Sequence, residues 1–177
     1  MDRIVKNSVK NDKIEGSDLI GELAALVLMS AALWFFVAHK VNETGFYTEE
    51  FGGMEMFALY SAGAFTVFTA AVRIALRRHN IVRPLETASF VLLSIAHAVL
   101  LARFPFDFDH VADVLPGALE WTVGWISETI GKVILALGIP GGIIAAAITM
   151  MIYFGVKKEL SAVQEPPPTP SEDDSDA

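Results

Sequence analysis

The sequence predicts an all-α integral membrane protein: a bundle of four transmembrane helices with both termini in the cytoplasm. Two observations predict this fold class. Of the 177 residues, 53% are hydrophobic and only 19% are charged, whereas a soluble domain carries about 25% charged residues. The hydrophobic residues also occur in long continuous blocks instead of alternating or amphipathic patterns, and this arrangement suits a lipid environment.

Four such blocks cover residues 18–39, 54–76, 85–104 and 133–156. Each is long enough, at about 1.5 Å per residue, to cross a hydrocarbon core of about 30 Å. Lysines precede the first block, but its apolar run is too long for a signal peptide and no small-residue cleavage site follows, so we expect an uncleaved span. The third block begins directly after Pro84, a residue that suits the first turn of a helix. The spans delimit a membrane domain, residues 18–156, preceded by a cytoplasmic segment, residues 1–17.

The last block contains Pro140 between glycines, which allows two interpretations. Residues 133–156 form one span kinked at Pro140, or Pro140 lies in a turn between two shorter spans at about 115–137 and 141–156. The second interpretation would bring Glu120 and Glu128 into lipid, which is costly near the bilayer centre. Four spans are therefore favoured over five.

The distribution of basic residues supports the same choice. With four spans, ten of the 13 lysines and arginines lie on the cytoplasmic side and three lie outside, namely Lys40, Arg103 and Lys132. Five spans would move Lys157 and Lys158 outside and change the division to eight and five. Short cytoplasmic loops carry an excess of lysine and arginine, so the four-span topology with cytoplasmic termini is predicted.

Residues 115–132 are predicted to form an amphipathic helix that lies in the outer interface. At 100° per residue, Leu115, Val123 and Ile130 share one face, and Glu120 and Glu128 lie on the opposite face. Two tryptophans border the apolar face, Trp121 and Trp125. An apolar face, an acidic face and indoles at the border are typical of a helix at headgroup depth.

The chain end, residues 157–177, is predicted to be a disordered, acidic cytoplasmic tail. Five acids in the last thirteen residues contribute much of the net charge of −8, and consecutive prolines stiffen the segment. With the charge concentrated there, nothing in the composition indicates a nucleic-acid partner. The absence of cysteine excludes disulfides, thiolate nucleophiles and cysteine-ligated metals.

His97 lies inside the third span and is the first candidate functional residue. A histidine in a span is costly enough to require a partner, and it could relay protons or ligate haem, with His39 as a second axial ligand at a similar level. The simpler interpretation, which we favour, is an imidazole bonded to a hydroxyl or a backbone carbonyl. No cofactor is predicted.

The loop sequence FDFDHVAD carries a possible set of metal ligands: Asp107, Asp109, His110 and Asp113. The donors are oxygen and imidazole, but the segment lacks the glycine and the distal glutamate of an EF-hand loop. A solvated acidic loop explains these residues more simply, and no metal is predicted.

Three further sets of residues have structural interpretations. Arg77, Arg78 and Arg83 form a basic loop that could hold anionic lipid headgroups or a cytoplasmic partner, although the favoured interpretation is that these charges only mark the cytoplasmic side of the membrane. Glu22 and Arg73 lie near the cytoplasmic ends of their spans, where snorkelling to headgroups is favoured over pairing. Small residues at helical spacing predict close helix packing in the second span (Ala58, Ala62, Thr66, Ala70) and in the last span (Gly138, Gly142, Ala146).

No motif of membrane-enzyme chemistry occurs in the sequence: there is no HExxH and no paired Ser–His or Asp–Asp at membrane depth. The sequence therefore predicts a non-catalytic accessory, anchoring or assembly subunit in the cell membrane. Its expected partners are the lipid bilayer and other membrane subunits or a second copy of itself. Two alternatives remain open: a small oligomeric transporter or channel, and a haem-binding anchor that uses His97.

Overall fold

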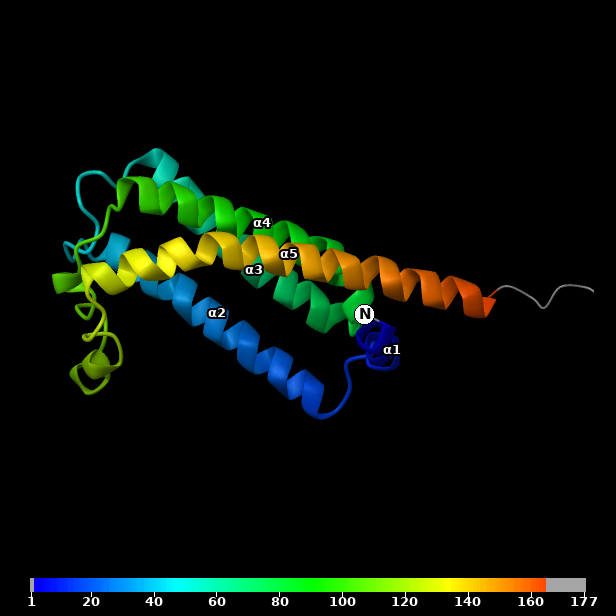
Figure 1. Cartoon of the computed structure of the whole chain (residues 1–177). Helices are drawn as coiled ribbons and strands as arrows, with labels where there is room; N and C mark the ends of the chain where they lie inside the picture. Colours follow the sequence, from blue (N-terminus) through cyan, green and yellow to red (C-terminus); the bar gives the residue numbers. More distant parts are fainter. Residues whose placement is uncertain (1, 165–177) are drawn as a thin grey trace, which may run out of the picture.

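The computed structural model describes residues 2–164, and every regular element within them is helical. Four long helices, α2 to α5, are long and apolar enough to cross a membrane, in agreement with the predicted fold class. Figure 1 shows the arrangement. The elements are α1 (Asp2–Lys10), α2 (Ser17–Val41), α3 (Gly53–Leu76), α4 (His79–Arg103), two short 3₁₀ helices, η1 (Phe108–His110) and η2 (Gly117–Thr122), and α5 (Glu128–Gln164).

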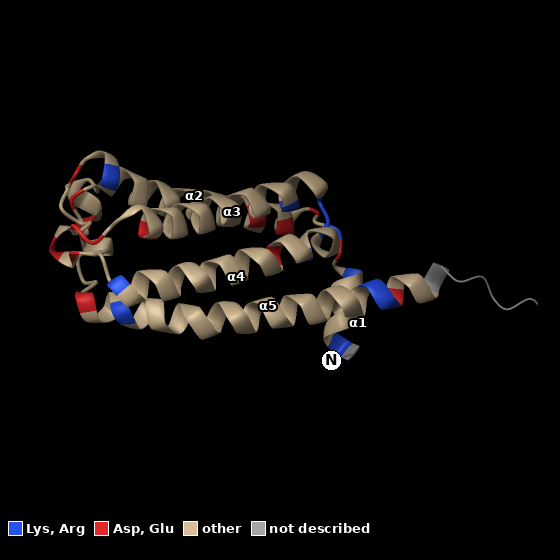
Figure 2. Cartoon of the chain, turned by 90° about the horizontal axis from the view of Figure 1, so that it is seen from above, with Lys and Arg blue, Asp and Glu red and all other residues tan. Residues whose placement is uncertain are grey.

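Consecutive long helices pack against each other: α2 on α3, α3 on α4 and α4 on α5. The short helix α1 packs on α5, where Val5 lies against Gly155 so closely that a Cβ atom at position 155 would come within 2.6 Å of the valine. The start of the chain and the last part of α5 therefore lie at the same end of the bundle (Figure 1). Charged residues gather towards the two ends of the long helices (Figure 2).

The bundle is not closed on one side. Helix α2 packs against α3, and among residues 2–164 no comparable packing joins it to α5. In Figure 1, α2 slopes away from α5 towards its own N-terminus. The flank between these two helices therefore has no helix–helix contact to close it.

Helix α5 runs without interruption through Pro140, which confirms one helix instead of two spans joined by a turn. The Ser94 hydroxyl on α4 donates to the carbonyl of Ile139, beside the proline, at 3.1 Å. Because Pro140 has no N–H, the carbonyl that loses its helical partner is that of Ala136, four residues earlier. The bond from Ser94 therefore joins α4 to α5 beside the proline and does not replace the missing bond. The helix also includes residues 157–164, which the sequence assigned to the tail. The remainder of the predicted tail, 165–177, lies outside the described residues.

Helix α4 begins at His79, earlier than the predicted start after Pro84. The reason is a contact that is remote in sequence: the carboxylate of Asp12 accepts the N–H of Asn80 at 2.7 Å, and the carbonyl of Asp12 accepts the N–H of His79 at 2.9 Å. Both bonds satisfy donors that a helix N-terminus leaves free. The predicted basic loop is therefore reduced to a tight turn at Arg77 and Arg78.

The predicted interfacial helix over 115–132 is not formed as a continuous helix. Only Gly117–Thr122 is regular, as a short 3₁₀ helix, and α5 begins at Glu128. The indole N–H groups of Trp121 and Trp125 donate to the carbonyls of Ala118 and Thr122, at 3.0 and 2.8 Å. The hydroxyl of Thr122 likewise donates to the carbonyl of Leu119, at 2.6 Å. Such local bonds from threonine offer the backbone an alternative to the α-helical pattern, and they accompany the short 3₁₀ helix that stands in place of the predicted amphipathic one.

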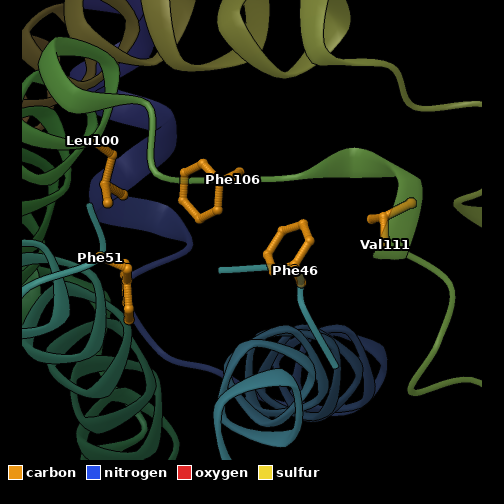
Figure 3. Close-up of a cluster of buried hydrophobic side chains, with 5 residues drawn as sticks. All are labelled: Phe46, Phe51, Leu100, Phe106 and Val111. Carbon is orange, nitrogen blue, oxygen red and sulfur yellow. The ribbon is translucent and has the colours of Figure 1, made fainter. Parts of the chain in front are cut away.

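Two loops, residues 42–52 and 104–127, meet over one end of the bundle. The backbone of Asp107 donates to the carbonyl of Phe46 at 2.8 Å, and the rings of Phe46 and Phe106 lie 5.2 Å apart. We call the buried cluster at this junction the aromatic cap; Figure 3 shows its five members, Phe46, Phe51, Leu100, Phe106 and Val111. The aromatic cap closes this end of the bundle with apolar side chains from both loops and from α4.

Candidate binding site

A cavity of about 430 Å³ lies beneath the aromatic cap, between the four long helices. Met29 and Phe36 of α2, Ala62 of α3, His97 of α4 and Leu135 of α5 contribute to its walls. The volume falls in the range of about 300–1,000 Å³ that is usual for small-molecule sites. The cavity therefore has the size of a small-molecule site, and its walls come from all four long helices.

Among the side chains that line this cavity, only Thr66 and His97 are polar. The Thr66 hydroxyl donates to the carbonyl of Ala62 at 2.8 Å, and it lies 2.8 Å from the hydroxyl of Ser89 on α4. Thr66 is therefore engaged in holding α3 to α4. His97 is left as the side chain with hydrogen-bonding capacity to offer.

The two ring nitrogens of His97 have different surroundings. Nδ1 lies 2.6 Å from the carbonyl oxygen of Leu93. A carbonyl only accepts, so Nδ1 carries the hydrogen. Nε2 has no hydrogen-bond partner among residues 2–164, and it is not enclosed. The favoured interpretation, a histidine bonded to backbone, holds for one nitrogen and leaves the other free.

Gly138 on α5 makes room for this ring. A Cβ atom at position 138 would lie 2.2 Å from Cδ2 and 2.5 Å from Nε2 of His97, closer than atoms can approach. Gly142, one turn further, faces Ser94 of α4, and a Cβ there would lie 2.8 Å from the carbonyl of Phe90. The glycines predicted as a packing seam thus lie against α4, and one of them holds the imidazole in place.

His39 is not free for a ligand. Its Nε2 donates to the carbonyl of Val111 at 3.2 Å, and its Nδ1 accepts from the hydroxyl of Thr44 at 2.6 Å. The residue is only 1% exposed. Both nitrogens are used to tie the end of α2 to the loops of the aromatic cap, so neither is available for the haem alternative in which His39 would pair with His97.

The acidic loop residues make local bonds instead of converging. Asp107 accepts the N–H of Asp109 at 3.0 Å and so caps η1. His110 pairs with Asp113 at 2.8 Å, and this hydrogen bond raises the pKa of His110 above its usual value. Within residues 2–164, no three histidine or carboxylate side chains come together as metal ligands.

Arg73 pairs with two carboxylates, and the favoured snorkelling interpretation is wrong. Its guanidinium binds Glu22 of α2, with Nε 2.7 Å from the carboxylate, and it also contacts Glu86 of α4. The three side chains are only 14–17% exposed. Sequence reasoning missed Glu86, which lies two residues after Pro84 and contacts Arg73. This ion-pair cluster joins three helices near the end that carries α1.

The remaining predicted residues occupy structural positions. Ala62 and Ala70 of α3 and Ala146 of α5 are buried, whereas Ala58 is half-buried. Arg77 and Arg78 are exposed at the turn. Arg83 lies on α4 and donates to the side chain of Asn80 at 2.9 Å.

The sequence matches no protein-family model, and no curated protein or solved structure is similar to it.

Proposed function

We propose that this protein is a non-catalytic accessory subunit of the cell membrane that binds a hydrophobic molecule inside its own bundle. The cavity between the four long helices supports the proposal: it is lined almost wholly by apolar side chains, and among residues 2–164 no comparable helix packing joins α2 to α5 beside it. A site of this kind suits a ligand that arrives through lipid. Four spans with both termini in the cytoplasm complete the proposal, supported by the ten-to-three division of basic residues.

The polar groups of the long helices also favour a binding role over a conducting one. The ion-pair cluster of Arg73, Glu22 and Glu86 and the hydroxyl pair of Thr66 and Ser89 hold helices to one another. The transporter and haem alternatives remain predictions. Flux measurements in liposomes test the first, and an absorption spectrum of the purified protein tests the second.

A cavity-filling variant tests the binding role. Ala32 of α2 lines the cavity, whereas its neighbour Ala31 is not part of the lining; both residues are exposed. The full chain, purified in mild detergent, is extracted with organic solvent and analysed by mass spectrometry. We expect one apolar compound in fixed ratio to the wild-type protein and to Ala31→Phe, and its loss from Ala32→Phe.

Equal amounts of the compound in both variants would contradict binding in the cavity. The accessory role is tested separately on the same preparation by native gel electrophoresis. A second polypeptide in fixed ratio to the chain is expected. Migration of the wild-type protein without any second polypeptide, in detergents that preserve membrane complexes, would contradict the accessory role.

A further inference from the structure

We propose that the molecule bound in the cavity carries a hydroxyl group that donates a hydrogen bond to Nε2 of His97. This inference rests on the proposed function and names the class of ligand: an apolar alcohol or phenol. It depends on three features of the cavity, namely the tautomer of His97, the fixed position of its ring and the apolar character of the other walls.

The tautomer decides which partner the ring accepts. Because Nδ1–H donates to the carbonyl of Leu93 at 2.6 Å, Nε2 of the neutral ring carries a lone pair and is an acceptor. A hydroxyl donor therefore matches Nε2, while a ketone, an ester or an ether, which only accept, does not. A purely aliphatic ligand would leave Nε2 dehydrated without a partner, which disfavours its binding.

His97 lines the cavity, its ring is held in a fixed position, and Nε2 keeps surface that other protein atoms do not cover. The bond to Leu93 fixes one edge of the imidazole, and the backbone of Gly138 packs against the edge formed by Cδ2 and Nε2. A fixed acceptor loses little freedom when it binds, which strengthens selectivity for a matching donor. Thr66 does not compete, since its hydroxyl already donates to Ala62.

The other walls define the body of the ligand. Five phenylalanines of α2 and of the cap loops contribute to the lining: Phe35, Phe36, Phe46, Phe106 and Phe108. No charged side chain is among the lining residues. An uncharged ring or chain with one hydroxyl fits this composition, whereas an ionic headgroup would be dehydrated without a counter-charge.

A pair of probes of similar size tests the inference. Naphthol carries the hydroxyl, and methylnaphthalene replaces it with a methyl group. Binding of each probe to the full-length protein in detergent micelles is measured by fluorescence titration. Each dissociation constant is expressed relative to the concentration of the probe dissolved in the micelles, so that the different solubilities of the two probes do not affect the comparison. We expect naphthol to bind about three- to tenfold more tightly, the range that one net hydrogen bond gives.

Two variants test whether His97 causes the preference for naphthol over methylnaphthalene. His97→Phe should bind both probes with equal affinity, because the ring volume remains and the acceptor is lost. Thr66→Val should retain the preference for naphthol. In the wild-type protein, the nitrogen NMR signal of Nε2 of His97 should shift when naphthol is added and stay in place with methylnaphthalene, a measurement that does not depend on how the variants fold.

The outcomes separate this inference from the proposed function. The hydroxyl assignment would be overturned, while the binding role stands, by either of two results. The first is equal binding of the two probes to the wild-type protein, and the second is an Nε2 signal of His97 that does not shift when naphthol is added. A naphthol preference that survives in His97→Phe would overturn the role of His97. Failure of both probes to bind, or binding unchanged in Ala32→Phe, would remove the binding role itself.

Discussion

Single glycines set the distance between α4 and α5. Gly142 faces Ser94 and the backbone of Phe90, whereas its neighbour Gly141 has no atom within 4 Å of a Cβ built on it. The two positions carry the same residue in the same turn of the same helix and differ only in what they face. Substituting each glycine with alanine therefore separates the effect of packing on stability from the effect of helix propensity.

We expect Gly142→Ala to lower the free energy of unfolding by about 1–3 kcal/mol, because the added methyl group must push α4 away. Gly141→Ala should be neutral or slightly stabilising, since alanine is the better helix former. Thermal unfolding in detergent, followed by circular dichroism, measures both. If the two variants had the same midpoint, close packing at Gly142 would be excluded.

Arg73 is the charged residue on which three helices depend. Removing it leaves the carboxylates of Glu22 and Glu86 near each other without a positive charge. We expect Arg73→Gln to cost about 3–5 kcal/mol of unfolding free energy, the usual penalty for breaking a buried ion pair. Glu86→Gln should cost less, because Arg73 keeps Glu22 as a partner.

Arg78→Gln is the matched control for Arg73→Gln, since Arg78 is exposed in the turn between α3 and α4. A surface change of this kind stays within about 0.5 kcal/mol. The same denaturation assay applies to all three variants. An effect of Arg73→Gln as small as that of Arg78→Gln would indicate that Arg73 reaches the headgroups instead of its partners.

At the scale of elements, the start of α4 is fixed by a residue from another part of the chain. Asp12 lies in the segment between α1 and α2 and caps α4 through its carboxylate and its carbonyl. The same segment is joined to the α3–α4 turn by the backbone of Ile14, which donates to the carbonyl of Arg77 at 3.1 Å. The N-terminal segment is thus part of the folded bundle.

We expect Asp12→Ala to lower stability by about 0.5–2 kcal/mol through loss of the cap. Asp12→Asn should retain most of the stability, because the amide oxygen accepts the same N–H. Asn11→Ala serves as the control at the exposed neighbouring position. Hydrogen exchange of the amides of His79 and Asn80 localises the effect, and unchanged protection in Asp12→Ala would contradict the capping role.

For the whole molecule, the packing of α1 on α5 brings the two ends of the described chain to the same end of the bundle. Both ends of the chain can lie on the same side of a membrane only if the chain crosses it an even number of times, and this arrangement fits that condition. Ten basic residues are assigned to that side and three to the other, so that side should face the cytoplasm.

Reporter fusions therefore have a defined expected pattern. A fusion after Lys158 should report a cytoplasmic position, and a fusion within the loop at Asp113 should report the opposite side. An external signal after Lys158 together with a cytoplasmic signal at Asp113 would invert the topology. If both fusions reported the same side of the membrane, the prediction of four membrane crossings would be contradicted.

Composition and the length of the apolar blocks were sufficient to predict an all-helical chain with four long apolar helices. Blocks of apolar residues long enough to cross a bilayer depend only on composition and length, so the presence of the four helices could be predicted. The bounds agree within two residues for α2 and α3, whereas α4 begins at His79 instead of residue 85 and α5 covers Glu128–Gln164 instead of 133–156. The continuity of α5 through Pro140 was also predicted, because the charges of Glu120 and Glu128 disfavoured the alternative.

The partners of the polar residues could not be predicted in this way, because they are remote in sequence and come together only when the helices pack. Asp12 caps a helix 68 residues away, and Arg73 meets Glu22 at a separation of 51 residues. The turn that replaced the predicted interfacial helix, and the one nitrogen of His97 that stays free, also depend on hydrogen bonds that periodicity does not encode. A hydrophobic pattern specifies where a helix is stable, whereas the partner of each polar group depends on which helices lie side by side.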